Sequence, residues 1–135
     1  MKREKLMKKL GIGVDIIDNS RIKRSIINKR FLFKVFSKAE IINSKKTSNK
    51  TGYFSKRFAA KEAFSKALGT GFSNGIYWKD IGVINDKYGK PKIKLTGKSL
   101  KKFKKLIPKN KKHSINLTLS DENHIAHALV IISSH

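Results

Sequence analysis

Cysteine is absent from this sequence of 135 residues, and proline occurs only twice. A chain without cysteine forms neither a disulfide framework nor a thiolate metal site, which suits a reducing cytosol. Long hydrophobic runs are also missing, because the longest apolar stretches, residues 11–17 and 126–132, have the length of strands. Residues 1–10 are basic but lack the apolar core of a secretory signal. We therefore expect a basic N-terminal tail over residues 1–10, a single domain over 11–135, and no association with a membrane.

Acidic residues are scarce, since only nine stand against 32 lysines and arginines, which gives a formal net charge of +23. A field of this sign attracts nucleic acids, anionic membranes, acidic proteins and phosphorylated ligands. Most of the excess is lysine, and isoleucine and asparagine are abundant too. An AT-rich genome would impose the same mixture on surface positions. The charge is therefore compatible with an acidic partner and equally with compositional drift.

A nucleic-acid-binding module is the main alternative class that the charge suggests. No helix-turn-helix, zinc-finger or RRM signature occurs in the sequence. The aromatic residues Phe54, Phe58 and Phe64 have the spacing of a helix that faces a core, whereas single-strand binding needs an exposed stacking surface. The four histidines also lack the context of a zinc site. We expect no specific nucleic-acid partner.

Hydrophobic patterns predict helices and strands in turn along the chain. The clearest helix covers residues 53–68, which contain no proline and end at Gly69, a residue suited to a helix C-terminus. Ser37 and Glu40 form a capping box that opens another helix. The other predicted elements are a strand over 11–17, a short helix over 21–28, a hairpin of strands over 81–84 and 92–95, a basic helix over 99–107, and strands over 114–119 and 124–133. This order predicts an α+β fold with a mostly antiparallel sheet.

Two acidic residues stand out by their positions. Asp15 lies in the apolar strand between Val14 and Ile16, where a carboxylate is unfavourable unless it is paired or binds a metal. A carboxylate that caps a helix or pairs with a lysine would explain it as well. Glu62 lies on the helix over 53–68, away from the middle of the apolar face, where a simple solvated charge is the ordinary interpretation.

Basic residues surround Glu62 on the same helix. Arg57 and Lys61 are four residues apart and so reach the same spot, and Lys66 follows five residues later. An anion such as phosphate would bridge these like charges, although a solvated surface would tolerate them too. The segment Gly69–Thr70–Gly71 then allows a ligand to approach the backbone closely. Its residue order excludes a Walker A loop, and Gly69 is already explained as the end of the helix.

These pieces, taken in order, resemble the holo-[acyl-carrier-protein] synthase family of phosphopantetheinyl transferases. The family begins with a Gly-Ile-Gly-x-Asp-Ile strand followed by Arg-Ile, which stand here at residues 11–16 and 21–22. Its second block, Arg-Phe-Ala-x-Lys-Glu-Ala-x-x-Lys-Ala-x-Gly-Thr-Gly, is complete over residues 57–71. A Gly-Lys-Pro turn follows at residues 89–91, and the final strand pair resembles the segment 117–122 with Ala126 and Val130. The resemblance covers nearly all of the chain from Gly11 onward.

The resemblance implies a magnesium-dependent transfer of phosphopantetheine from coenzyme A to a serine of an acidic acyl carrier protein. Asp15 and Glu62 would be the protein ligands of one Mg2+, and the pyrophosphate of coenzyme A would complete the octahedral shell. Mn2+ would suit the same oxygen site. The products would be holo-acyl carrier protein and adenosine 3′,5′-bisphosphate. The resemblance also implies a homotrimer, a cytoplasmic location and a role in fatty acid biosynthesis.

Other residues receive roles from the same resemblance. Arg21 would face the carrier protein. The groups expected to hold or border coenzyme A are Arg57, Lys61 and Lys66 at its phosphates, Gly69, Thr70 and Gly71 along the backbone, and Gly89, Lys90 and Pro91 at its adenine end. Some family members carry a histidine, suggested as a catalytic helper, where this chain has Asp121. We interpret Glu62 as the general base, acting directly or through a metal-bound water, with Asp121 as the other candidate.

Two further alternatives concern the class of transferase. Enzymes of broader specificity that act on large synthase complexes are typically about twice this length, so the short chain favours the small trimeric class. An inactive relative kept as a subunit is disfavoured, because both candidate metal ligands and the whole second block are present.

Overall fold

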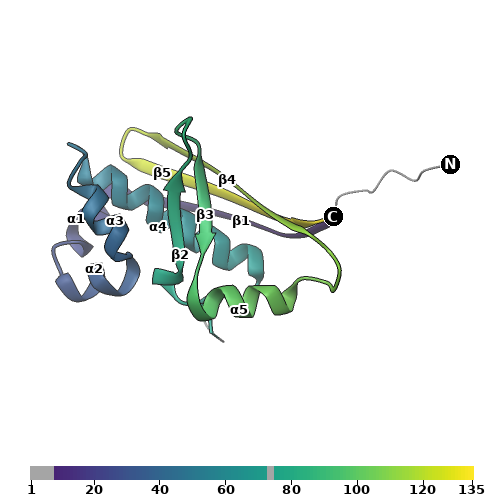
Figure 1. Cartoon of the computed structure of the whole chain (residues 1–135). Helices are drawn as coiled ribbons and strands as arrows, with labels where there is room; N and C mark the ends of the chain where they lie inside the picture. Colours follow the sequence, from purple (N-terminus) through teal and green to yellow (C-terminus); the bar gives the residue numbers. More distant parts are fainter. Residues whose placement is uncertain (1–7, 73–74) are drawn as a thin grey trace.

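The computed structural model describes residues 8–72 and 75–135. Five α-helices, one short 3-10 helix and five strands follow one another along these residues, and Figure 1 shows their arrangement. In chain order they are β1 (Lys8–Asp18), α1 (Asn19–Ser25), α2 (Lys29–Val35), α3 (Lys38–Ser44), α4 (Lys50–Leu68), η1 (Trp78–Asp80), β2 (Ile81–Asn85), β3 (Pro91–Leu95), α5 (Gly97–Leu106), β4 (His113–Glu122) and β5 (Ile125–Ser134).

The main sheet has three antiparallel strands in the order β1-β5-β4, so β1 and β4 are its two edges. The strands alternate between two faces, as the period of two requires. The inner face carries buried residues such as Ala126, Ala128 and Val130 of β5. The outer face carries Ile12, Val14 and Ile16 of β1, which are 52%, 54% and 61% exposed. An apolar outer face of this kind is unusual for a sheet that meets only water.

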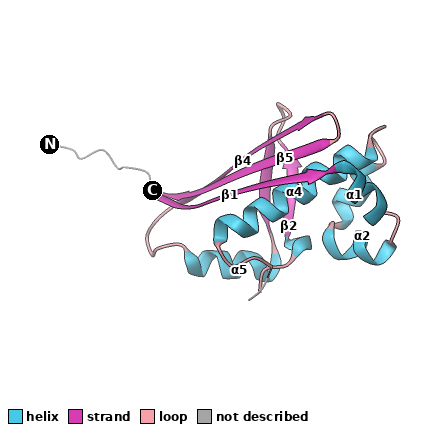
Figure 2. Cartoon of the chain, turned by 180° about the vertical axis from the view of Figure 1, so that it is seen from behind, coloured by secondary structure: helices cyan, strands magenta, loops and turns pink. Residues whose placement is uncertain are grey.

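The long helix α4 packs along the inner face of this sheet, chiefly against β1 and β5. The close approach depends on two glycines of β1, because a Cβ atom at Gly11 would overlap the carbonyl of Ala67, and one at Gly13 would overlap that of Ala63. In Figure 2 the sheet lies in front of α4 and the β2–β3 hairpin behind it, and Figure 1 shows the reverse order. The helix therefore forms the central layer of the fold.

The core gathers around α4. Its aromatic part includes Phe36, Phe54 and Phe64, which are at most 4% exposed. The amphipathic helix α5 closes the core by inserting Phe103, whose ring lies 5.9 Å from that of Phe64. No helix in residues 8–72 and 75–135 is long and apolar enough to cross a membrane.

The predicted α+β class with an antiparallel sheet is confirmed. Gly69 ends α4 in the left-handed conformation, with φ of 79°, as its position predicted. The helix begins at Lys50, three residues earlier than predicted, because the side chain of Asn49 caps it by accepting from the N–H of Gly52. Strand β1 likewise begins at Lys8, within the segment interpreted as a tail, whose residues 1–7 lie outside the described part.

The predicted helix over 21–28 is wrong in its bounds. Asp18 caps α1 through the N–H of Ser20, so the helix begins earlier and ends at Ser25. The side chain of Asn28 then accepts from the N–H groups of Arg30 and Phe31 and starts α2, a second helix that the sequence pattern did not predict.

Candidate active site

Asp15 lies on β1 and points to the inner face, because it has the same parity as Gly11 and Gly13. The two glycines bring β1 against α4, and Gly13 lies against Ala63, the residue that follows Glu62. Asp15 therefore faces the helix near Glu62. The side chain of Asp15 is only 13% exposed. A carboxylate in this position needs a cationic partner, and the structure provides one.

That partner is Lys66. Its ammonium nitrogen lies 3.0 Å from Oδ1 of Asp15 and donates a second hydrogen bond of 3.0 Å to the carbonyl of Val14. Its side chain is 53% exposed, so it reaches the site from the solvent side. This pair places the carboxylate of the strand and the cation of the helix in direct contact.

Glu62 belongs to the same electrostatic cluster. Its pKa is raised above the ordinary value, chiefly because partial burial disfavours the ionised form, and next because Asp15 adds a like charge nearby. Lys66 and Arg21 act in the opposite direction on this pKa. Two carboxylates and two cations from β1, α1 and α4 therefore act on one another, at a point where Glu62 has no ion-pair partner of its own among the described residues.

Arg21 reaches this cluster from the first turn of α1, three residues beyond the strand end. Its guanidinium carbon lies 5.5 Å from the centre of the Phe58 ring. Phe58 in turn stacks on Trp78, whose other neighbour is Phe72 at a ring distance of 3.5 Å. The aromatic stack supports the cation from one side and leaves its donors free to bind an anion.

The donor set at this cluster suits a hard divalent cation. Asp15 and Glu62 offer carboxylate oxygens, and no group of three or more candidate metal ligands occurs in the part of the chain that the structure describes. Magnesium is usually held by one or two carboxylates, with water and substrate phosphate filling the remaining positions. The raised pKa of Glu62 also means that a cation would relieve the repulsion between the two carboxylates.

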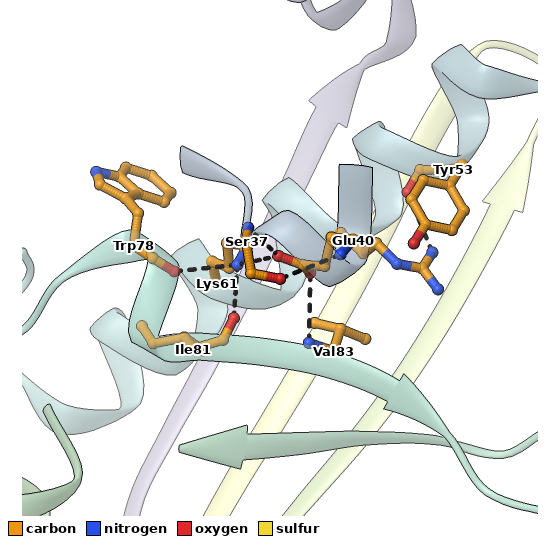
Figure 3. A network of polar contacts seen from close by, with 8 residues as sticks. Ser37, Glu40, Tyr53, Lys61, Trp78, Ile81 and Val83 are labelled. Carbon is orange, nitrogen blue, oxygen red and sulfur yellow. Dashed lines mark hydrogen bonds and ion pairs between the residues drawn. The ribbon is translucent and has the colours of Figure 1, made fainter. Parts of the chain in front are cut away.

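The interpretation of Lys61 as a phosphate ligand is wrong. Its side chain is completely buried, and its ammonium donates to Oε1 of Glu40 at 2.8 Å and to the carbonyls of Trp78 and Ile81 at 3.0 and 2.6 Å (Figure 3). These three bonds use all three of its N–H groups. Burial lowers the pKa of Lys61, and Glu40 counteracts this shift. Lys61 therefore faces away from any ligand at the surface.

Arg57 stays compatible with an anion. Its guanidinium carbon lies 3.5 Å from the centre of the Tyr53 ring, and Nη1 donates to the Tyr53 carbonyl at 3.2 Å. Burial lowers its pKa. Its Nε is buried without a hydrogen-bond partner within residues 8–72 and 75–135. An unsatisfied cationic donor of this kind is unfavourable, and a phosphate oxygen would satisfy it.

The remaining predicted residues lie elsewhere. Gly69 and Gly71 adopt positive φ on either side of Thr70 just beyond α4, and part of the loop that follows, residues 73–74, lies outside the described residues. Gly89 also has positive φ, in the turn before Lys90 and Pro91. Those two residues line a hollow of about 350 Å³ at the β4 edge of the sheet, together with Asn116, Leu117, Thr118, Leu119, Leu129 and Ile131.

Asp121 is exposed near the end of β4 and has the inward parity of Leu117 and Leu119. Its register partner on β5 is Ala126, which pairs on its other side with Ile17 of β1. Asp15 and Asp121 thus lie two strands and two residues apart, which corresponds to roughly 12 Å between their Cα atoms. A single chain brings together Asp15, Glu62, Lys66 and Arg21, but it leaves Asp121, Lys90 and Pro91 at the opposite sheet edge.

Two features of this region escaped the sequence analysis. Glu40 was recognised as part of a capping box but not as the partner of Lys61, which lies 21 positions later. The alternating glycine and aliphatic residues of β1 predict a buried strand and give no sign that its outer face is exposed.

The sequence matches the model of the 4′-phosphopantetheinyl transferase superfamily over residues 11–126. A holo-[acyl-carrier-protein] synthase of Pelagibacter ubique is 52% identical over 126 residues, which cover 93% of this chain and 98% of that relative. The crystal structure of a holo-(acyl-carrier-protein) synthase from Bacillus anthracis in complex with CoA (3′,5′-ADP) matches with a TM-score of 0.77 and 32% identity, covering 96% of this chain and 100% of the other. The holo-[acyl-carrier-protein] synthase from Neisseria meningitidis matches with a TM-score of 0.79 and 32% identity, covering 92% and 98%.

Proposed function

The chain belongs to the 4′-phosphopantetheinyl transferase superfamily, and on this basis we propose that it transfers phosphopantetheine from coenzyme A to a serine of apo acyl carrier protein. The observation that carries the proposal is the cluster of Asp15, Glu62 and Lys66, where two carboxylates and a cation meet at the sheet edge. A relative with 52% identity named as this synthase supports it, as does the similar Bacillus anthracis structure in complex with CoA (3′,5′-ADP).

Asp15 and Glu62 are the residues that we propose to hold Mg2+. When bound there, the cation would neutralise the pyrophosphate of coenzyme A and stabilise the charge that develops during transfer. Mn2+ suits the same oxygen donors. The fit rests on the carboxylate oxygens, on the small exposed fraction of Asp15 and on the raised pKa of Glu62.

The transfer then follows the general logic of phosphoryl transfer, in which the protein chiefly positions and neutralises. The serine hydroxyl of the carrier protein attacks the phosphorus that bears the pantetheine arm, and a new oxygen–phosphorus bond forms. The bond from that phosphorus to the bridging oxygen breaks, and adenosine 3′,5′-bisphosphate leaves with the electron pair. The serine proton passes to the carboxylate of Glu62, which acts as the general base.

Coenzyme A would be held by residues from several elements. Lys66 is exposed enough to leave Asp15 and bind a phosphate oxygen. Arg57 would satisfy its free Nε with another phosphate oxygen. Gly69, Thr70 and Gly71 would offer backbone for a close approach. Lys90 and Pro91, with Gly89 allowing the turn, would border the adenine at the hollow beside β4.

We propose a homotrimer because the candidate groups lie at opposite edges of one sheet. Asp15 is on edge strand β1, whereas Lys90, Pro91 and Asp121 lie at edge strand β4. If the β1 edge of one copy meets the β4 edge of the next, both sets lie in one site. A copy that also lies over the outer face of β1 would cover the exposed apolar side chains of Ile12, Val14 and Ile16.

The acidic carrier protein would dock where Arg21 meets the cluster, at the start of α1. Arg21 lies over the ring of Phe58 and is close enough to Glu62 to lower the pKa of that carboxyl group. A carboxylate beside the carrier serine would therefore bind Arg21 close to the reacting groups. The high positive charge of the chain would steer an acidic partner toward it. The role in fatty acid biosynthesis and the cytoplasmic location stay predictions.

Intact-mass analysis of an apo acyl carrier protein tests the proposed function. The carrier is incubated with this protein, coenzyme A and Mg2+, and a parallel sample contains EDTA. We expect a mass gain of one phosphopantetheine group that EDTA abolishes. A folded protein that gives no gain with several carrier proteins contradicts the proposal, and a gain that persists in EDTA contradicts the metal requirement alone.

A further inference from the structure

Glu40 and Lys61 form a buried ion pair at the centre of the fold, shown in Figure 3. Besides its bond to Lys61, Oε1 of Glu40 accepts from the N–H of Ser37 at 2.9 Å. Oε2 accepts from the N–H of Val83 at 3.4 Å. The pair therefore joins three parts of the molecule: the start of α3, the middle of α4, and the η1–β2 segment that supplies the two carbonyls bound by Lys61.

A charge pair of this kind adds little net stability. Removing two charges from water is unfavourable, and well-packed apolar side chains of similar volume often serve as well or better. What the pair offers is direction, because each hydrogen bond has a preferred length and angle. All three donors of Lys61 are used by acceptors at fixed positions in α3, η1 and β2. Together with the buried aromatic side chains of α4, the pair therefore restricts how far the helix can rotate about its own axis.

The side of α4 that packs on β1 has only the half-exposed Lys66 as a directional contact among the described residues. It meets β1 through the backbone and small side chains of Ala63 and Ala67, which face Gly11 and Gly13. Surfaces made of alanine and glycine allow close approach, but they contain no long side chains that interlock. On this side, therefore, no buried side-chain hydrogen bond between described residues of α4 and β1 fixes the rotation of the helix.

Glu62 is the next residue after Lys61, so the two side chains point about 100° apart around the helix. A helix rotation of about 15° would move a carboxylate roughly 6 Å from the axis by about 1.6 Å. Binding sites need their groups within about 0.5 Å and 10–20° of the productive geometry. The orientation of Glu62 toward Asp15 thus depends on what fixes the rotation of α4.

We propose that the Glu40–Lys61 pair is a positioning device for Glu62. By locking α4 to α3, η1 and β2, it directs the Glu62 carboxylate toward Asp15 at the β1 edge. Lys61 and Glu40 touch neither substrate nor metal, and they act through the helix. The inference rests on the proposed function in one respect, since it takes Glu62 to be a metal ligand.

The test compares the full-length protein with variants at the pair. Glu40→Asp keeps the charge but withdraws the acceptor, and the double variant E40Q/K61M removes both charges while keeping an acceptor for the N–H of Ser37. Phe103→Leu in the buried face of α5 is the matched control, because it loosens the packing on α4 through Phe64 while leaving the hydrogen bonds of the pair in place. Glu62→Gln serves as the reference for the loss of the metal ligand itself.

Three quantities are measured for each protein. They are the thermal midpoint, the Mn2+ dissociation constant from electron paramagnetic resonance of free Mn2+, and the Mg2+ concentration that gives half-maximal transfer.

We expect both variants at the pair to weaken Mn2+ binding by about tenfold or more, as changes to groups that orient metal ligands do. The Mg2+ requirement should rise in parallel. Phe103→Leu should lower the thermal midpoint but leave the Mn2+ dissociation constant within about twofold of the wild-type value, because a change in stability alone does not move a metal constant in a folded protein.

Three results overturn the inference. Folded pair variants could bind Mn2+ as tightly as the wild type, Phe103→Leu could weaken binding as much as they do, or all pair variants could fail to fold, which would make the pair a requirement for folding only. Failure of the proposed function is a separate result. A wild type that binds Mn2+ through Glu62 but forms no holo carrier protein contradicts the transfer, while the ratio of dissociation constants still decides the role of the pair.

Discussion

The ammonium nitrogen of Lys66 lies 3.0 Å from Oδ1 of Asp15, and this contact joins α4 to the edge strand β1. The lysine therefore occupies space beside the carboxylate that we assign to the metal. A cation that binds Asp15 and Glu62 must share or displace it. Asp15 is nearly buried, whereas Lys66 is half exposed. The lysine can therefore move away without disturbing the strand.

Replacing Lys66 with methionine should have opposite effects on the two ligands. Without the competing ammonium group, Mn2+ should bind the coenzyme-free protein severalfold more tightly, whereas the KM for coenzyme A should rise about tenfold. The metal-free protein should lose stability, because Asp15 is only 13% exposed and would be left without its cationic partner. Lys104→Met on the exposed face of α5 is the matched control. An unchanged KM for coenzyme A would show that Lys66 only neutralises Asp15.

Glu62→Gln should stabilise the metal-free protein at neutral pH. The pKa of Glu62 is raised, first by burial and then by Asp15. A carboxyl group with a raised folded pKa favours folding in its protonated form, so its contribution is present below the ordinary pKa of glutamate and is lost as the pH rises through the raised value. The thermal midpoint of the variant should therefore exceed that of the wild type at pH 7 but not at pH 4. Added Mg2+ should raise the midpoint of the wild type and leave the variant unchanged. A variant that is less stable at pH 7 without metal would contradict the assigned repulsion.

Gly13→Ala tests the close approach of β1 and α4. The added methyl group would overlap the carbonyl of Ala63, so strand and helix must separate. Overpacking of this kind costs about 1–3 kcal/mol of unfolding free energy. Separation also draws Asp15 away from Glu62, so transfer should fall more than the loss of stability explains. Gly82→Ala on β2 is the control, because its nearest contact would be an ordinary 3.4 Å. Denaturant unfolding gives the change in unfolding free energy of both variants, and turnover gives the change in transfer activity. Equal behaviour of the two would contradict the role given to Gly13.

The sequence allowed the elements that carry the site to be predicted, but not every direction in which side chains point. Asp15 was identified because a carboxylate breaks an apolar pattern, and Glu62 because few acids occur in this chain and the resemblance assigned it a role. The spacing of Arg57 and Lys61 indicated one helix face. Nothing local revealed that Glu40, 21 positions before Lys61, lies opposite that face and buries the lysine.

Strand order limited the prediction of the site in the same way. The hairpin with Lys90 and the strand with Asp15 were both predicted, yet their separation depends on the order β1-β5-β4, which places them at opposite edges. Local patterns contain no information on which strands become neighbours. Local patterns also do not show what covers a strand face. The apolar sequence around Ile12, Val14 and Ile16 is typical of a strand buried on both faces, yet these side chains are exposed in the single chain.

Val14→Arg tests whether the outer face of β1 is an interface between copies. Val14 is 54% exposed and lies beside Leu129 of β5, so a charge there should disrupt an apolar contact but leave the single chain folded. We expect light scattering to show the wild type as a trimer and the variant as a monomer with little activity. Ile42→Glu on α3, a residue of similar exposure at 53%, should remain a trimer. A wild type that is monomeric and fully active would contradict the shared site.

The assignment of Asp15 and Glu62 to the metal is tested by the yield of holo carrier protein over a series of Mg2+ concentrations. The wild type, Asp15→Asn and Glu62→Gln are compared, with circular dichroism confirming that each is folded. We expect transfer by the wild type to rise with Mg2+ and saturate. Both variants should lose at least about 100-fold at every concentration, since each lacks a ligand of the cation that neutralises the pyrophosphate. Transfer by either variant at the wild-type rate and with the wild-type Mg2+ dependence would contradict the claim that Asp15 and Glu62 together hold the catalytic metal.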